Sequence, residues 1–322
     1  MNAAYRKQTA IDIAKMYYIN GESQDQIAAA TGMSRSNISR ILKKCVDDGI
    51  VEIVVHDNIS KRPELGHKLC GAFGLKDAII VPSDSSEERV ARHAGERVAL
   101  YLESILQDNM LLGVGRGRAC YYTGRNLKNE YNLHVDVIQM LGAASSTASL
   151  EESNGLISLF VSKLNGTGYV LNAPLMVRSK RTKQELLDNA LLHNTMKRYQ
   201  DIDVAIFEVS QPDLYARNLS RQEWLTKADL LQLSEVRVVS CVCGYYFDQN
   251  GHSCNAGIND RILAISQEQL RKIPYSIGIL TGKNTLPSAL SVLRSGLINV
   301  LVVDESLALR LESYIDDLPE DT

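Results

Sequence analysis

The sequence predicts an α/β protein in which a small winged helix-turn-helix domain precedes a doubly wound, mostly parallel α/β domain. A helix-turn-helix pattern occupies 23–45, and an alternating apolar run that fits a β-wing follows at 50–55. Beyond residue 64, short runs of Val, Ile and Leu alternate with amphipathic helical patterns, as in a parallel sheet covered on both faces. We expect a DNA-binding domain at 1–56, a linker at 57–63 and an α/β domain at 64–322.

Each part of the helix-turn-helix pattern has a physical reason. Ser23 and Gln26 have the spacing of a capping box, which starts a helix. Gly32 supplies the positive φ that a tight turn between two helices needs. The inner face of the helix pair is apolar at helical spacing, with Ile27, Ile38 and Ile41.

The outer face of the second helix is polar and basic, and no acidic residue occurs at 33–46. Such a helix can enter a major groove with its first turn at the base edges and its lysines near phosphates. The predicted DNA-binding residues are Ser34, Arg35, Ser36, Asn37, Arg40, Lys43 and Lys44. The alternative is a plain pair of packed helices without a DNA-binding role.

Charge and composition agree with DNA contact at one end of the chain. The 322 residues carry a net charge of −3, but 1–62 hold nine Lys and Arg against seven Asp and Glu, so the rest is acidic. The hydrophobic content of 45% is enough for ordinary cores. No apolar run approaches the ~18 residues of a membrane span, and no signal peptide is evident. We expect a cytoplasmic protein with reduced thiols and no membrane partner.

The remaining elements follow from local patterns. A first helix is expected at 6–19 and a connecting helix at 64–73. Strands are expected at 78–81, 111–114, 135–141, 169–171, 204–207, 236–247, 275–280 and 298–303. Further helices are expected at 85–106, 150–164, 183–199, 286–295 and 305–314.

Three small polar loops follow strands of the predicted sheet, at 113–118, 142–147 and 281–285. Ligands of open α/β sheets bind beyond the carboxyl ends of the strands. Glycines let backbone N–H groups approach an anion, and Arg116 and Arg118 add positive charge. The loops therefore predict a crevice for a small polyhydroxylated or anionic ligand. The alternative is that they only connect strands to helices.

The chain offers little for catalysis or for a cofactor. It contains no nucleophile elbow, no P-loop and no pair of histidines at metal-binding spacing, and its six histidines are scattered. The glycine loop is not GxGxxG, so the sequence does not predict a dinucleotide site. We expect no enzyme activity, no cofactor and no metal. The cysteines are expected to be buried thiols, with a metal or redox site at Cys241, Cys243, His252 and Cys254 as the alternative.

In this order and spacing, several segments resemble the SorC/DeoR-type sugar-binding transcriptional regulators. The segments lie at 17–18, 23–40, 48–51, 73–75, 113–118, 172–175, 244–248 and 296–304, so the resemblance covers nearly the whole chain. It implies an effector domain that looks like a sugar-phosphate isomerase or deaminase, with a Rossmann-like fold, but lacks catalysis. It also implies a homodimer or homotetramer on operator DNA, with an affinity that a sugar, polyol or sugar-phosphate effector changes.

Four positions depart from the pattern of this family. Cys241 replaces an Asp that faces the sugar, Glu208 begins the segment that usually reads Gly-Ile-Gly, and Arg116 stands where Trp is common. Thr285 replaces a Lys of the late loop, with Lys283 two residues earlier. A thiol is a weak hydrogen-bond acceptor, and Glu208 would crowd or repel a phosphate. We therefore expect that the fold is conserved and that the pocket is altered. Its ligand then differs from the usual sugar phosphates, or it binds weakly or not at all.

The effector-binding residues that these considerations predict are Gly113, Gly115, Arg116, Gly117, Arg118, Gly142, Cys241, Gly282, Lys283, Asn284 and Thr285. Two other functions stay open from the sequence. One is an isomerase- or deaminase-like enzyme with a DNA-binding head. The other is an oligomeric DNA-binding protein that responds to no effector.

Overall fold

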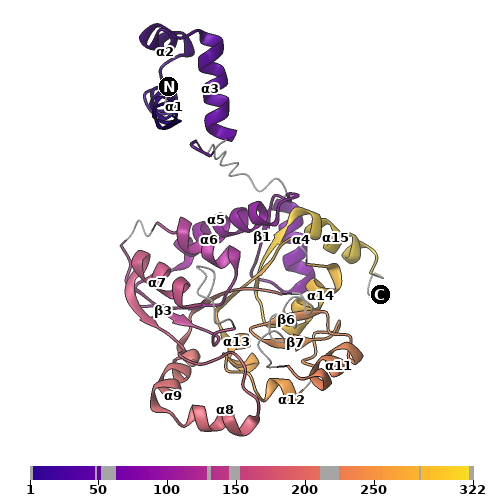
Figure 1. Cartoon of the computed structure of the whole chain (residues 1–322). Coiled ribbons are helices and arrows are strands. Elements are labelled where there is room, and N and C mark those ends of the chain that lie inside the picture. Colours follow the sequence, from indigo (N-terminus) through magenta and orange to yellow (C-terminus); the bar gives the residue numbers. More distant parts are fainter. Residues whose placement is uncertain are drawn as a thin grey trace. The chain divides into compact units, whose positions relative to one another are not determined.

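The computed structural model describes residues 3–47, 49–51, 63–128, 132–144, 153–210, 225–254, 256–282 and 284–318. The chain divides into two compact units, Met1–Ile59 and Ser60–Thr322 (Figure 1). The first is helical, and the second is an α/β unit with a parallel sheet. The predicted fold class is confirmed. None of the described helices is long and apolar enough to cross a membrane.

The N-terminal unit contains α1 (Ala3–Tyr18), α2 (Gln24–Thr31) and α3 (Arg35–Asp47). Ser23 and Gln26 form the predicted capping box: the Ser23 hydroxyl accepts from the Gln26 N–H at 3.3 Å, and the Ser23 N–H donates to Gln26 Oε1 at 2.8 Å. Gly32 ends α2 with a φ of 68°. The core of the unit contains Ile13, Ile27, Ile38 and Leu42. The expected wing lies almost entirely outside the described residues.

Seven parallel strands form the sheet of the second unit within its described residues, in the order β1-β9-β8-β5-β2-β3-β4. Their bounds are β1 (Asp77–Val81), β2 (Leu111–Val114), β3 (Val135–Gln139), β4 (Asn165–Tyr169), β5 (Val204–Glu208), β8 (Tyr275–Leu280) and β9 (Val300–Asp304). From β2 the chain builds outward through β3 and β4, and it then returns to the other side of β2 with β5. The sheet therefore has a topological switch point between β2 and β5.

Helices cover both faces of the sheet (Figure 1). On one face, α5 (Glu87–Ile105), α6 (Arg118–Asn126) and α7 (Ser153–Leu164) share a core with the sheet. On the other face, α4 (Pro63–Phe73), α13 (Gln267–Lys272), α14 (Leu286–Ser295) and α15 (Glu305–Asp316) share a second core. Because both faces are buried, the central strands read as continuous Val, Ile and Leu runs.

The expected strand at 236–247 is wrong. The chain instead forms an antiparallel hairpin of β6 (Ser240–Val242) and β7 (Tyr245–Phe247). Cys243 and Gly244 make the two-residue turn, with φ values of 48° and 91°. Positive φ at both positions suits the twist of a hairpin, and glycine adopts it readily.

Several other elements differ from expectation. Asn189 accepts a hydrogen bond from the Leu191 N–H at 3.0 Å and starts a new helix, so the expected helix at 183–199 is divided. Its parts are α8 (Lys180–Leu187), α9 (Ala190–Lys197) and a 3₁₀ turn, η1 (Arg198–Asp201). The strand expected at 169–171 lies earlier, as β4, where Gly166 allows close contact with the Val135 backbone. The helices α6, α11 (Lys227–Glu235), α12 (Ala256–Asn259) and α13 were not expected.

Candidate functional site

A crevice lies beyond the carboxyl ends of β2 and β5, at the switch point of the sheet. It is narrow, because the space in which a water molecule could be centred is only about 10 Å³. Its walls are Gly115, Arg116, Leu141, Phe207, Glu208, Ser210, Cys241, Cys243 and Gly244. Three predicted effector residues, Gly115, Arg116 and Cys241, are therefore brought together here. This is the position where open α/β sheets bind ligands.

The glycine loop after β2 keeps that strand close to β5. The Gly115 N–H donates to the Ile206 carbonyl at 2.8 Å, and a Cβ at Gly115 would lie 2.6 Å from Phe207 Cβ. Gly113 has a similar role inside β2, where a Cβ would lie 2.8 Å from the Met140 sulfur. Both positions therefore require glycine for packing, independently of any ligand.

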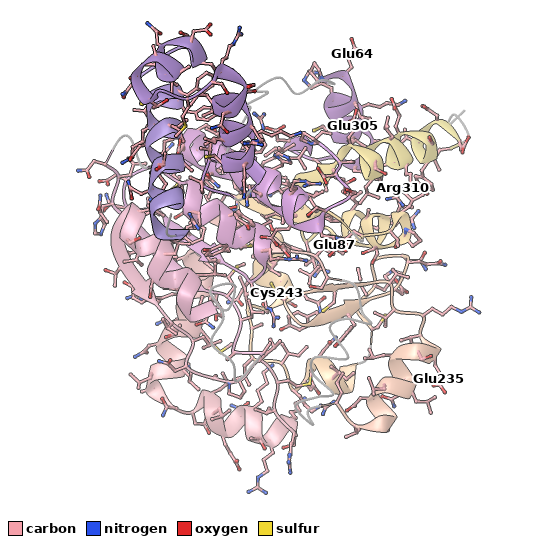
Figure 2. All side chains as sticks on the ribbon, turned by 45° about the horizontal axis from the view of Figure 1, so that its top comes forward. Glu64, Glu87, Glu235, Cys243, Glu305 and Arg310 are labelled. Atoms are coloured by element: carbon pink, nitrogen blue, oxygen red, sulfur yellow. The ribbon has the colours of Figure 1, made fainter. Side chains whose placement is uncertain are left out.

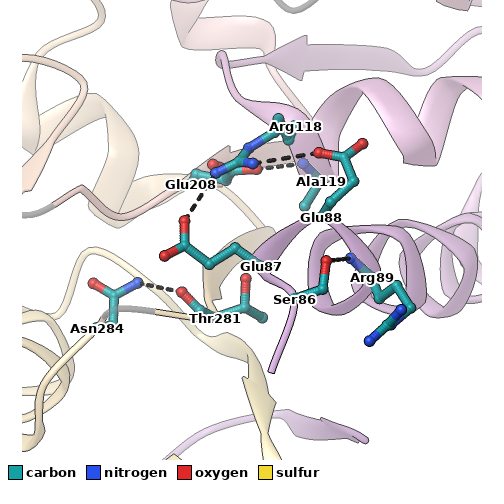
Figure 3. Close-up of polar contacts among 9 residues, drawn as sticks. All are labelled: Ser86, Glu87, Glu88, Arg89, Arg118, Ala119, Glu208, Thr281 and Asn284. Atoms are coloured by element: carbon teal, nitrogen blue, oxygen red, sulfur yellow. Dashed lines mark hydrogen bonds and ion pairs between the residues drawn. The ribbon is translucent and has the colours of Figure 1, made fainter. Parts of the chain in front are cut away.

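Gly117 and Glu208 meet at the start of α6. Gly117 is the N-cap residue of α6, with a φ of 131° and no side chain to cap the helix. The Glu208 carboxylate takes that place, because it accepts a hydrogen bond from the Ala119 N–H (Figure 3). It also lies against the Gly117 Cα, where a side chain would collide with it. An anion at a helix N-terminus is favourable because the N–H groups and the helix dipole point toward it.

Arg118 points toward acidic residues of this chain. Its guanidinium contacts Glu87 Oε2 at 3.2 Å and Glu88 Oε2 at 3.3 Å, both in the first turn of α5 (Figure 3). The Tyr122 hydroxyl also donates to Glu88, and this hydrogen bond raises the pKa of Tyr122. The predicted positive charge of Arg118 is therefore balanced locally.

Cys241 forms part of the crevice wall and is buried. Its backbone pairs with Ser210 through hydrogen bonds of 3.0 and 2.9 Å, which attach the hairpin to the end of β5. Burial raises the pKa of Cys241 well above that of a free thiol and raises the pKa of Cys243 to about 12. Both remain thiols at neutral pH. Within the described part of the chain, no three His, Cys, Asp or Glu residues are placed to hold a metal ion.

The other predicted loops lie beside the crevice. Asn284 is buried and donates to the carbonyls of Val209 at 3.3 Å and Thr281 at 3.1 Å, which connects the loop after β8 to the chain that follows β5. Thr285 caps α14. Gly282 has a φ of 72°, and a Cβ there would lie 3.6 Å from Glu87 Cγ. Lys283 lies outside the described residues.

Gly142 is placed by packing, since its N–H donates to the Leu263 carbonyl at 2.9 Å and a Cβ would lie 2.5 Å from the Pro174 backbone. The hydroxyl residues at 145–147 lie outside the described residues. Six further residues line the crevice and were not among the predicted effector residues: Leu141, Phe207, Glu208, Ser210, Cys243 and Gly244. Gly244 follows the predicted crevice residue Cys241 by three positions, but only the hairpin brings both to one wall.

The predicted DNA-binding residues lie on or just before α3 of the N-terminal unit. Ser34, Arg35, Ser36, Arg40, Lys43 and Lys44 are exposed, and Asn37 is half-buried. Arg40 Nη2 donates to Asn37 Oδ1 at 2.9 Å, so these two side chains are held together. Arg35 lies 3.6 Å from Asp25 of α2, but both side chains are about 70% exposed, so the pair is weak.

Comparison with known proteins agrees with this geometry. Residues 57–311 match the family described as "Putative sugar-binding domain", and residues 20–52 match "Winged helix-turn-helix DNA-binding". The first match covers most of the chain. The chain belongs to this sugar-binding domain family.

Individual relatives that match over nearly their whole length are transcriptional regulators. The chain is 26% identical over 314 residues to the deoxyribonucleoside regulator of Bacillus subtilis, covering 97% of this chain and 99% of that one. It is 25% identical over 301 residues to the sorbitol operon regulator of Klebsiella pneumoniae, covering 92% and 95%. The crystal structure of full-length SorC from Klebsiella pneumoniae matches with a TM-score of 0.73 and 26% identity, covering 94% and 98%.

These matches confirm the SorC/DeoR-type resemblance. The chain is a helix-turn-helix transcriptional regulator with a sugar-binding domain.

Proposed function

We propose that this regulator binds operator DNA through α3 and that a small sugar, polyol or sugar phosphate in the crevice changes its affinity for that DNA. The observation that carries the proposal is the crevice at the switch point between β2 and β5, in a chain that also has a helix-turn-helix unit. In this scheme residues 1–56 bind DNA, 57–63 link the domains and 64–322 bind the effector and form the oligomer.

On the DNA side, residues of the first turns of α3 read the bases. Arg35 and Arg40 suit guanine, Asn37 suits adenine, and the hydroxyls of Ser34 and Ser36 suit either base or phosphate. Lys43 and Lys44 hold the phosphate backbone, which gives affinity without sequence preference. A homodimer or homotetramer presents two such helices, and a separation of about 34 Å lets them read successive major-groove faces.

The protein acts in the cytoplasm as a binding protein and not as an isomerase or deaminase. An enzyme of that kind needs a general acid and base positioned in the crevice. The thiol of Cys241 occupies one wall with a strongly raised pKa, and the Glu208 carboxylate is bound to the Ala119 N–H. The raised pKa keeps Cys241 a neutral thiol near neutral pH, so it does not serve as a base there.

Two experiments test the proposed function. In vitro selection from random duplex DNA with the full chain should enrich a two-fold symmetric motif, and the absence of any enriched motif would contradict operator binding. A thermal melt against a panel of sugars, polyols and their phosphates should reveal a ligand. A ligand at 100 times its Kd that binds only the folded state stabilises by ~2.7 kcal/mol. No shift across the panel would contradict the effector role.

A further inference from the structure

A carboxylate of this chain occupies the N-terminus of α6. The helix spans nine residues, and its N-cap is a glycine that provides no capping group. Glu208, at the end of β5, accepts from the Ala119 N–H in the first turn. Its carboxylate lies where a phosphate or carboxylate of a ligand would lie if it bound that helix end.

The space beside Gly117 is fully used by this carboxylate. A Cβ placed on Gly117 would contact Glu208 carboxylate oxygen Oε1 at 2.7 Å, so backbone and carboxylate are already in close contact. A second anion at the same N–H groups would have to displace the Glu208 side chain. Glu208 is also one of the residues that line the crevice, so its charge faces any bound ligand.

The surrounding charges do not favour an anion either. Among the residues that line the crevice, the cation is Arg116 and the carboxylate is Glu208. Arg118 contacts the carboxylates of Glu87 and Glu88 (Figure 3). Like charges a few ångströms apart in a partly buried site repel strongly, and a phosphate here would lie beside Glu208.

We propose that Glu208 is a specificity-determining residue that selects an effector without a phosphate or other anionic group at the α6 end of the crevice. The ligand class is a neutral sugar or polyol, whose hydroxyls can donate to a carboxylate. The inference rests on the proposed function, because it specifies what the same crevice binds. Exclusion of anions by Glu208 can also be tested without an effector.

The effector-free experiment uses inorganic phosphate as the probe and the full chain as the protein. Thermal melts compare phosphate with chloride at equal ionic strength, for wild type, Glu208→Ala, Glu208→Gln and a control, Glu64→Gln. Glu64 is an exposed carboxylate in the first turn of α4, away from Cys243 and the crevice (Figure 2). Glu64→Gln changes the net charge by the same amount as the Glu208 variants but does not alter the contacts of α6.

Phosphate stabilises folded proteins in general. Glu208→Ala should therefore show an additional, saturable stabilisation that wild type and Glu64→Gln lack. Glu208→Gln removes the charge but keeps the size of the side chain, which still fills the space at the start of α6. Its stabilisation by phosphate should therefore be smaller than that of Glu208→Ala. Stabilisation of wild type by phosphate to the same degree as Glu208→Ala would overturn the inference. So would the absence of any additional stabilisation in both Glu208 variants. If Glu208→Ala does not fold, Glu208→Gln alone must show the additional stabilisation.

The effector experiment uses matched pairs of a neutral sugar or polyol and its phosphate, and measures Kd by calorimetry. Wild type should bind the neutral member of an active pair at least about tenfold more tightly, as expected from charge repulsion. Glu208→Ala should remove or reverse that preference. Tighter binding of the phosphate by wild type would overturn the inference and leave the proposed function intact. If neither member of any pair binds, the proposed function fails, while the inorganic phosphate experiment still decides the role of Glu208.

Discussion

At the scale of single residues, the hydrogen bond between Arg40 and Asn37 gives the sharpest prediction for DNA recognition. Arg40 Nη2 donates to Asn37 Oδ1 at 2.9 Å, so loss of Asn37 removes one of the proposed base-reading side chains and the hydrogen-bond acceptor of another. We predict that Asn37→Ala weakens binding to the selected operator by ~1–3 kcal/mol and spares binding to unrelated DNA. Fluorescence anisotropy with both duplexes measures this, and an equal loss on the two would refute base reading.

Lys43 provides the matched comparison, because it is exposed on the same helix near its C-terminal half. A phosphate contact carries no sequence information. Lys43→Ala should therefore weaken binding to operator and unrelated DNA alike, and it should reduce the slope of log K against log salt by about one. A salt series by anisotropy measures that slope, and a loss confined to the operator would show that Lys43 reads bases.

Residues of the candidate site were only partly predictable. Cys241 and Glu208 stand out from the sequence because they replace residues typical of the family. The contact between Glu208 and the Ala119 N–H could not be predicted, since it depends on how the ends of β5 and α6 meet. The sequence predicted Gly115 as a ligand-binding glycine. The structure shows that glycine is also required there because a Cβ would collide with Phe207.

At the scale of elements, the crossing of α5 and α6 positions the N-terminus of α6, where the Glu208 carboxylate lies. A Cβ at Gly95 of α5 would collide with Tyr122 and lie 2.7 Å from the Thr123 backbone nitrogen. We predict that Gly95→Ala destabilises the protein by ~1–3 kcal/mol, because the two helices must separate. Urea unfolding monitored by circular dichroism measures the change.

Gly71 of α4 is the control for this prediction. A Cβ there meets nothing within 4 Å, and its φ is not in the left-handed region. Gly71→Ala should stabilise the helix by up to ~1 kcal/mol, since alanine is the better helix former. Destabilisation of both variants to the same degree would contradict the account of the helix crossing.

An ion pair between Asp229 of α11 and Arg261 predicts that the stability of the protein depends on pH. Arg261 Nη2 lies 2.7 Å from Asp229 Oδ1, with side chains only 10% and 14% exposed. Burial alone would raise the pKa of Asp229, but hydrogen bonds from Thr226 and Arg261 outweigh it and lower that pKa. The lowered folded pKa means that this stabilisation is present above the unfolded value of about 3.9 and is lost as pH falls through the folded value.

Arg261→Met should therefore destabilise the protein by ~3–5 kcal/mol at pH 7, because it leaves a largely buried carboxylate without its cation. The difference from wild type should shrink toward pH 3. The exposed pair of Arg181 and Glu185, with side chains 87% and 60% exposed, is the control, and Arg181→Met should change stability little. Urea unfolding at both pH values measures this, and a pH-independent difference would be evidence against the ion pair.

Elements differed in how well the sequence predicted them. The strands at 111–114, 204–207 and 275–280 were found because both of their faces are buried and they read as continuous apolar runs. The hairpin of β6 and β7 was taken for one long strand, because a turn with cysteine in its first position gives no typical signal. The short helices α12 and α13 are too brief to show periodicity.

At the scale of the whole molecule, each unit has a hydrophobic core of its own. We predict that a fragment of residues 60–322 folds and keeps the ligand-induced thermal shift, since all described crevice residues belong to it. The same fragment should not bind operator DNA. Thermal melts and anisotropy measure the two properties, and loss of the ligand shift in a folded fragment would place part of the effector site elsewhere.

The central claim is that a ligand in the crevice changes DNA affinity, and one titration tests it most directly. The full chain is held on a fluorescent operator duplex at half saturation, and each neutral sugar or polyol that shifted the thermal melt is added. The account predicts a saturable change in anisotropy on addition of the ligand. The Asn37→Ala variant, used at a higher protein concentration so that it is also half bound, should show the same change. A ligand that binds the protein and leaves operator affinity unchanged would contradict the claim, because linkage requires a coupled ligand to alter DNA binding.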